Sequence, residues 1–169
     1  MKSNLLFDFI ADKQTNTMTI RREFAAGRPL VWDCYTQSEL LDQWFAPAPL
    51  TTKTKSMEFR EGGHWHYAMV DPTGMEYWGY VAYKTIQPID FYTTIDAFSN
   101  EAGEINQDLP QAQWRVTFTD KGENAVVETV VSYASLADLE KVVAMGMEQG
   151  MMATLEKLDN LLALLTNGK

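Results

Sequence analysis

The sequence has one cysteine and no apolar run long enough to cross a membrane. Cys34 has no partner for an internal disulfide, which indicates a reducing compartment. Because it lies in a helix-like apolar stretch, residues 31–35, we interpret it as a buried, inert thiol. The apolar start, residues 5–7, is interrupted by Asp8 and is too short for a signal peptide. We therefore expect a cytoplasmic protein that does not bind membranes.

Basic side chains are also few. The chain has 14 Lys and Arg residues against 23 Asp and Glu residues, a formal net charge of −9. Its densest basic cluster, Lys53, Lys55 and Arg60, is diluted by Glu58, so a phosphate backbone would be repelled. We expect no nucleic-acid partner.

Motifs for cofactors and activated nucleophiles are missing. No glycine-rich nucleotide loop, Gly-x-Ser-x-Gly or Cys-x-x-Cys occurs. His64 and His66, the only histidines, share one strand face and could chelate a metal. A third ligand would have to come from Glu58, Asp71 or Glu76. We interpret both as surface histidines and predict neither a metal nor a cofactor.

Strand and turn patterns dominate the first four fifths of the chain. Residues 17–25 alternate as a half-buried strand that ends before Gly27, and residues 6–10 are a candidate partner. Short turns rich in Gly, Pro and Asp separate later strands, which predicts an antiparallel meander. These strands are expected at residues 51–60, 64–70, 77–86, 91–98, 113–119 and 126–133, with one long polar loop at 100–111.

Helical patterns occur in two places. Pro29 suits a first helical position, and Ser38 suits the N-cap of a second short helix that Pro47 stops. From Ser135 to Leu165, apolar residues recur at three- and four-residue spacing. This spacing predicts one amphipathic helix of about 30 residues, long enough to lie across the whole sheet.

Gly146 and Gly150 would each destabilise the interior of that helix by about 1 kcal/mol. Either the sheet approaches closely at this point or space is left there for a ligand. The adaptable side chains of the nearby Met145, Met147, Met151 and Met152 favour a ligand, while plain core filling is the alternative.

Aromatic residues gather on the expected inner face of the sheet. Trp65, Tyr67 and Met69 share one face of a strand, as do Trp114, Val116 and Phe118, and both sets should face the helix. Trp78 and Tyr80 are further candidates for this inner face, although their strand carries aromatic residues on both faces. A cavity lined by these residues would offer apolar surface together with a few Tyr hydroxyl and Trp N–H groups that could orient a ligand. A general acid or base from Asp33, Glu58, Asp96 or a histidine remains open.

Several linked motifs resemble the Activator of Hsp90 ATPase homologue-like family of the START-like (SRPBCC, or Bet v-like) superfamily. Their carriers are Arg28 to Asp33, Glu39 to Phe45 with its Leu-x-x-Trp pattern, Met57 to Gly63, Asp71 to Gly74, and Gly146 with Met147. The chain differs from the family pattern at Phe45, where a second Trp is frequent, and at Met147, where a bulky aromatic is frequent.

The resemblance implies a single START-like domain over residues 1–169 with an α+β helix-grip fold. In this fold a curved antiparallel sheet wraps around a long C-terminal helix, and two short helices follow the first strand. It also implies a hydrophobic cavity but no particular reaction.

Three functions are compatible with this expectation: binding of a small hydrophobic molecule, a cyclase- or aromatase-type enzyme that uses the same cavity, and a chaperone-associated interaction module. A homodimer is possible. We predict that the ligand-binding residues are Trp44, Phe45, Trp65, Tyr67, Met69, Trp78, Tyr80, Trp114, Met147 and Met151.

Overall fold

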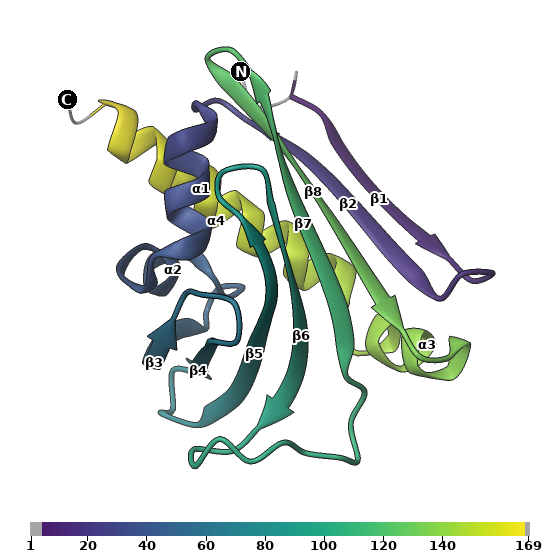
Figure 1. Cartoon of the computed structure of the whole chain (residues 1–169). Helices are drawn as coiled ribbons and strands as arrows, with labels where there is room; N and C mark the ends of the chain where they lie inside the picture. Colours follow the sequence, from purple (N-terminus) through teal and green to yellow (C-terminus); the bar gives the residue numbers. More distant parts are fainter. Residues whose placement is uncertain (1–4, 168–169) are drawn as a thin grey trace.

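A computed structural model describes residues 5–167 of the chain (Figure 1). Its eight strands form one antiparallel sheet in the order β1-β2-β8-β7-β6-β5-β4-β3. The strands are β1 (Phe7–Asp12), β2 (Thr17–Phe24), β3 (Thr51–Glu58), β4 (His64–Val70), β5 (Glu76–Gln87), β6 (Phe91–Ser99), β7 (Ala112–Lys121) and β8 (Asn124–Tyr133). The expected meander is confirmed, because each strand from β3 to β7 pairs with the next along the chain.

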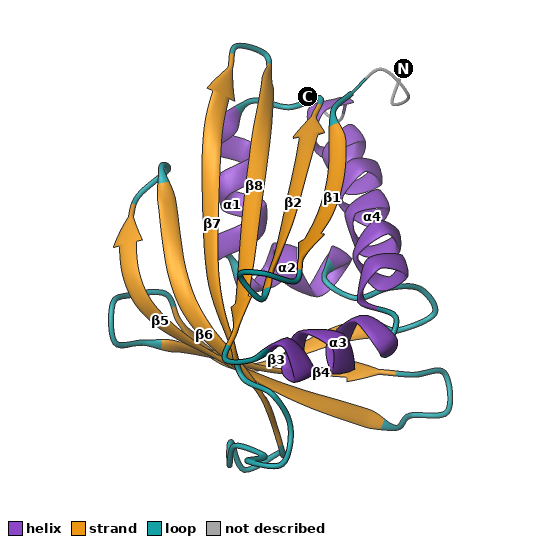
Figure 2. Cartoon of the chain, turned by 90° about the vertical axis from the view of Figure 1, so that its right-hand side faces the viewer, coloured by secondary structure: helices purple, strands orange, loops and turns teal. Residues whose placement is uncertain are grey.

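The helices are α1 (Arg28–Thr36), α2 (Ser38–Trp44), α3 (Leu136–Ala144) and α4 (Met147–Asn167). Figure 2 shows α1, α2 and α4 on one face of the strongly curved sheet, with α4 running along its concave side. This arrangement is the α+β helix-grip fold. The two short helices follow the first two strands rather than the first alone.

The prediction of one continuous C-terminal helix is wrong. Two helices are present, and the chain turns between them at Met145 and Gly146. Gly146 has a φ of +89°, a left-handed conformation that glycine adopts without the steric cost of a Cβ atom. Ser135 caps α3, because its hydroxyl accepts a hydrogen bond from the Asp138 amide at 3.1 Å.

The start of α2 also differs from expectation. Gln37, not Ser38, is the N-cap, and the Ser38 hydroxyl donates to Glu39 in the first turn at 3.0 Å. In α1, Pro29 occupies the first turn, where a missing amide hydrogen costs nothing.

A buried ion pair joins the sheet to the C-terminal helix. Arg22 on β2 pairs with Asp159 on α4, and both side chains are largely shielded from solvent. Two residues before Asp159 in α4, Lys157 donates to the carbonyl oxygens of Ala46 and Leu50 in the segment after α2. These contacts hold α4 against both the sheet and the α2–β3 connection. In the part of the chain that the structure describes, no helix is long and apolar enough to span a membrane.

Candidate ligand-binding site

A cavity of about 350 Å³ lies between the concave face of the sheet and the turn that joins α3 to α4. We call it the outer cavity. Apolar and aromatic side chains line most of it, and the helical side contributes Val142, Met145, Met147, Met151 and Thr154 together with the backbone at Gly146 and Gly150. Both glycines that the sequence singles out therefore border this space.

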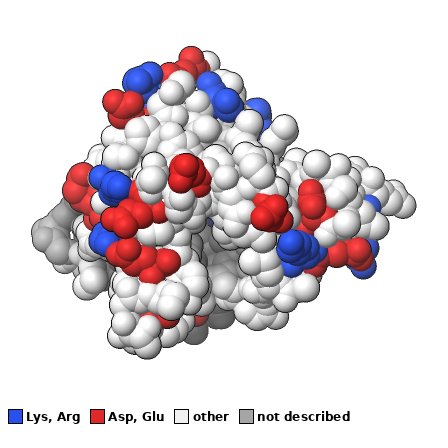
Figure 3. All heavy atoms as spheres, turned by 90° about the horizontal axis from the view of Figure 1, so that it is seen from below, with Lys and Arg blue, Asp and Glu red and all other residues white. Residues whose placement is uncertain are grey.

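The solvent-exposed part of the outer cavity's lining comes from the start of β5, the end of β6 and the end of α3, which lie at the lower end of the molecule in Figure 1. Tyr77, Phe98 and Met145 line the cavity and are also exposed to solvent, and Pro110 from the long loop completes this edge. Figure 3 views this end from below, where uncharged residues cover much of the surface between separate acidic and basic groups. A hydrophobic molecule would enter across an apolar rim.

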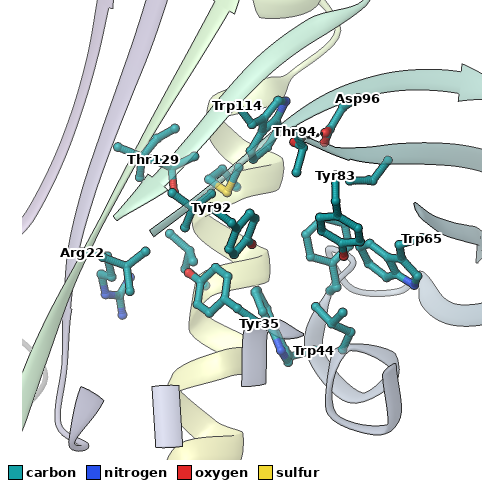
Figure 4. Close-up of a pocket in the computed structure, with 18 residues that line it drawn as sticks. Arg22, Tyr35, Trp44, Trp65, Tyr83, Tyr92, Thr94, Asp96, Trp114 and Thr129 are labelled. Carbon is teal, nitrogen blue, oxygen red and sulfur yellow. Dashed lines mark hydrogen bonds between the residues drawn. The ribbon is translucent and has the colours of Figure 1, made fainter. Parts of the chain in front are cut away.

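A smaller space of about 50 Å³, the inner cavity, continues deeper into the core (Figure 4). Phe45, Asp96, Trp114 and Met151 line both spaces and so form the boundary between them. Trp44, Trp65 and three tyrosines surround the inner space, where aromatic rings meet edge to face with centroids about 5 to 6 Å apart. This packing closes the far end of the site.

Asp96 is the one acidic side chain that lines either cavity. In Figure 4 it lies beside Thr94, whose hydroxyl donates to its Oδ1 at 2.6 Å. Protein surrounds the carboxyl, although part of its surface is still reached through the cavity. Burial raises its pKa from 3.8 to about 7, and the Thr94 hydrogen bond opposes this rise only in part. The group therefore exchanges a proton near neutral pH.

Four tyrosines, one each on β4, β5, β6 and β8, lie near Asp96. Burial raises the pKa of Tyr67, Tyr83, Tyr92 and Tyr133, and the nearby negative charge of Asp96 raises each further. Within residues 5–167, none of these four hydroxyl groups has a hydrogen-bond partner. Each is therefore free to donate to a molecule in the cavity.

The sheet register determines which side chains lie in the same row as Asp96. Trp65, Val81, Asp96, Ala112 and Tyr133 lie side by side on successive strands, so all five side chains point to the concave face. This row places the carboxylate between the aliphatic side chains of Val81 and Ala112, with the rings of Trp65 and Tyr133 at its two ends.

Nine of the ten predicted ligand-binding residues line one or both cavities. Phe45, Trp114 and Met151 line both. Trp44 and Trp65 line the inner cavity, and Tyr67, Met69, Trp78 and Met147 line the outer one. Trp78 borders the cavity, but its ring contacts His66 on the opposite face of the sheet.

Tyr80 lies outside both cavities. It pairs with His66 across β4 and β5, and its ring stacks on His64 with centroids 5.4 Å apart. A two-residue strand period makes Trp78 and Tyr80 share this outer face, while Gly79 and Val81 point inward. The aromatic residues of β5 alone could not reveal which set faced the helix.

The interpretation of His66 as a surface residue is wrong. Only 5% of its surface is exposed, because the loop after β6 covers it and the Asn100 carbonyl oxygen lies 2.9 Å from its Nε2. His64 is partly buried and contacts the Ser56 hydroxyl at 2.8 Å. Among the described residues, no three His, Cys, Asp or Glu side chains gather as a metal site would require.

The sequence did not single out Tyr83, Tyr92 and Tyr133, and it named Asp96 only as one of several possible acids. Alternation within β6 could have found part of this set, since Tyr92, Thr94 and Asp96 share one strand face.

A curved antiparallel sheet closed by a C-terminal helix around an apolar cavity defines a START-like domain. The sequence matches the model of the Activator of Hsp90 ATPase homolog 1-like protein family over residues 25–163. The chain belongs to this family.

Solved structures agree with this assignment. Protein Ms6760 from Mycobacterium smegmatis is 29% identical, with 94% of this chain and 96% of that chain covered and a TM-score of 0.85. A protein from Arthrobacter aurescens is 25% identical, with 92% and 91% covered and a TM-score of 0.87. The AHSA1 protein from Silicibacter pomeroyi, at 18% identity, shares the fold over 88% of this chain and 98% of its own, with a TM-score of 0.68. No curated protein sequence matches the chain.

Proposed function

We propose that this protein binds a small hydrophobic molecule in the outer cavity, between the sheet and α4. The observation that carries the proposal is the cavity itself: its volume of about 350 Å³ lies in the range of small-molecule sites, and its lining is mainly apolar. Burial of the ligand's apolar surface would supply most of the affinity. The single buried cysteine supports a reducing, cytoplasmic setting for this binding.

Native mass spectrometry of freshly purified protein, followed by organic extraction, tests the proposal. We expect a bound small molecule. An Ala112→Phe variant should lose it, because Ala112 is buried and lines the outer cavity. Gln113→Phe is the matched control, since the neighbouring side chain points to solvent. Empty wild-type protein that also fails to gain thermal stability across a lipid and aromatic library would overturn the proposal.

Asp96 favours a second candidate, an enzyme of the cyclase or aromatase kind that moves a proton in this cavity. A carboxyl group with a pKa of about 7 can act as acid or base at neutral pH. Such an enzyme carrying Asp96→Asn would hold unconverted substrate, so extraction would return different compounds from the variant and the wild type. A binding protein would return the same unaltered compound from both, in smaller amount from the variant where Asp96 contacts the ligand.

A further inference from the structure

The Asp96 carboxylate lacks a cationic partner within the described part of the chain. The lining of the outer cavity includes no Lys, Arg or His side chain. Arg22 lines the inner cavity, but Asp159 already neutralises it. An ionised carboxylate in such surroundings is costly unless a positive charge comes from elsewhere.

The surroundings of Asp96 would suit a cation. The rings of Phe45, Tyr67 and Trp114 line the outer cavity, and the negative faces of aromatic rings attract positive charge. The hydroxyl oxygens of Thr94 and Tyr133 can accept further hydrogen bonds from an ammonium group. The formal charge of −9 also favours the approach of cations over anions.

We propose that the ligand of the outer cavity is a hydrophobic amine, whose ammonium group pairs with Asp96 while its apolar body lies against the methionines and aromatic rings. This inference rests on the proposed function and assigns its ligand class. A neutral ligand would not stabilise the ionised form of Asp96, and an anionic ligand would add a like charge beside it.

Binding should depend on the protonation of Asp96. Below about pH 7 the carboxyl is increasingly neutral, so an amine must displace a proton and binds more weakly. The other titratable groups that face Asp96 are Tyr67 on β4, Tyr83 on β5, Tyr92 on β6 and Tyr133 on β8, all with raised pKa values. The side chains that α3 and α4 place in the outer cavity are not titratable.

Calorimetric titration with naphthylethylamine and naphthylethanol tests the proposal, because the two probes differ mainly in an ammonium against a hydroxyl group. At about pH 8 the amine should bind at least about ten-fold more tightly than the alcohol. At about pH 5.5 its affinity should fall about ten-fold or more, while that of the alcohol stays constant. Asp96→Asn should abolish the preference, and Asp108→Asn, which changes an exposed carboxylate, should preserve it.

Each result decides between the two proposals. An alcohol that binds as tightly as the amine overturns the amine inference and leaves hydrophobic binding in place. Failure of both probes to bind counts against both proposals. A preference that survives in Asp96→Asn, or disappears in Asp108→Asn, overturns the role given to Asp96.

Discussion

Gly79 lies directly opposite Tyr67 in the β4–β5 pair, so close that a Cβ atom at position 79 would stand 2.6 Å from Cζ of the tyrosine ring. The missing side chain therefore makes room for a ring that lines the outer cavity. The strand tolerates a glycine here because the aromatic ring fills the space above it.

Gly79→Ala should therefore force Tyr67 out of its position. We expect a loss of about 1 to 3 kcal/mol in the free energy of unfolding, the usual range for overpacking. Urea denaturation measures it. In the Gly79→Ala, Tyr67→Leu double variant the clash is gone, so its loss should be at least about 1 kcal/mol smaller than the sum of the single losses. Additive losses would show that the ring does not depend on Gly79.

Asp96 should make stability depend on pH. Folding raises its pKa from 3.8 to about 7, so the folded protein holds this proton more tightly. The resulting stabilisation is present below about pH 4 and is lost as the pH rises through 7. At about 1.36 kcal/mol per pKa unit, the change is on the order of 4 kcal/mol.

Urea denaturation of the wild type and Asp96→Asn at about pH 4.5 and pH 8 checks this dependence. The variant lacks the titrating group, so it should gain stability relative to the wild type as the pH rises. A constant difference between the two proteins would contradict the pKa of Asp96.

Gly146 and Gly150 should respond to alanine in opposite directions. At Gly146, with φ at +89°, alanine should reduce stability by about 1 to 2 kcal/mol. At Gly150, inside α4, the new Cβ atom would meet only the Pro47 ring at 3.8 Å, so alanine should add up to about 1 kcal/mol. Thermal unfolding of the two variants measures both changes, and effects of equal sign would argue for one continuous helix.

Removing one member of the Arg22–Asp159 pair should be costly. Asp159→Ala leaves a buried guanidinium without its partner, so we expect a loss of about 3 to 5 kcal/mol. Glu128→Ala is the control, because its ion pair with Arg21 is exposed and should contribute under about 1 kcal/mol. Equal losses in chemical denaturation would show that burial does not govern these pairs.

Cys34 should resist thiol reagents in the folded protein. It is fully buried, and burial raises its pKa to about 11, so the thiolate is scarce at neutral pH. Labelling with iodoacetamide at about pH 8, followed by mass spectrometry, should be slow without urea and complete in it. Rapid labelling of the native protein would contradict this burial.

Periodicity in the sequence was sufficient for most of the fold. Alternation and turn residues located the strands. One face of the sheet is buried, so every second residue of a strand must be apolar. The C-terminal apolar spacing continues across Gly146, so it could not reveal the break. The left-handed conformation of a single glycine does not change the spacing of the apolar residues around it.

The cavity lining was predictable where strands have one apolar face, as with Trp65 and Tyr67. His66 was misplaced because its burial comes from a polar loop that folds over the outer face of the sheet. Tyr80 was misplaced because its strand carries aromatic residues on both faces. The sequence could not rank Asp96 above the other acidic residues. Its pKa is raised by burial, and the residues that bury it come from strands distant in the sequence.

The pairing of β2 with β8 and the contact between Arg22 and Asp159 join residues more than a hundred positions apart. A topology so rich in distant contacts folds slowly, because long loops must close before these contacts form. During synthesis, the strands that carry Tyr67 and Asp96 emerge well before the helical residues that complete the outer cavity. A nascent chain therefore exposes its aromatic face until α4 leaves the ribosome, and a hydrophobic ligand finds its finished site only after that point.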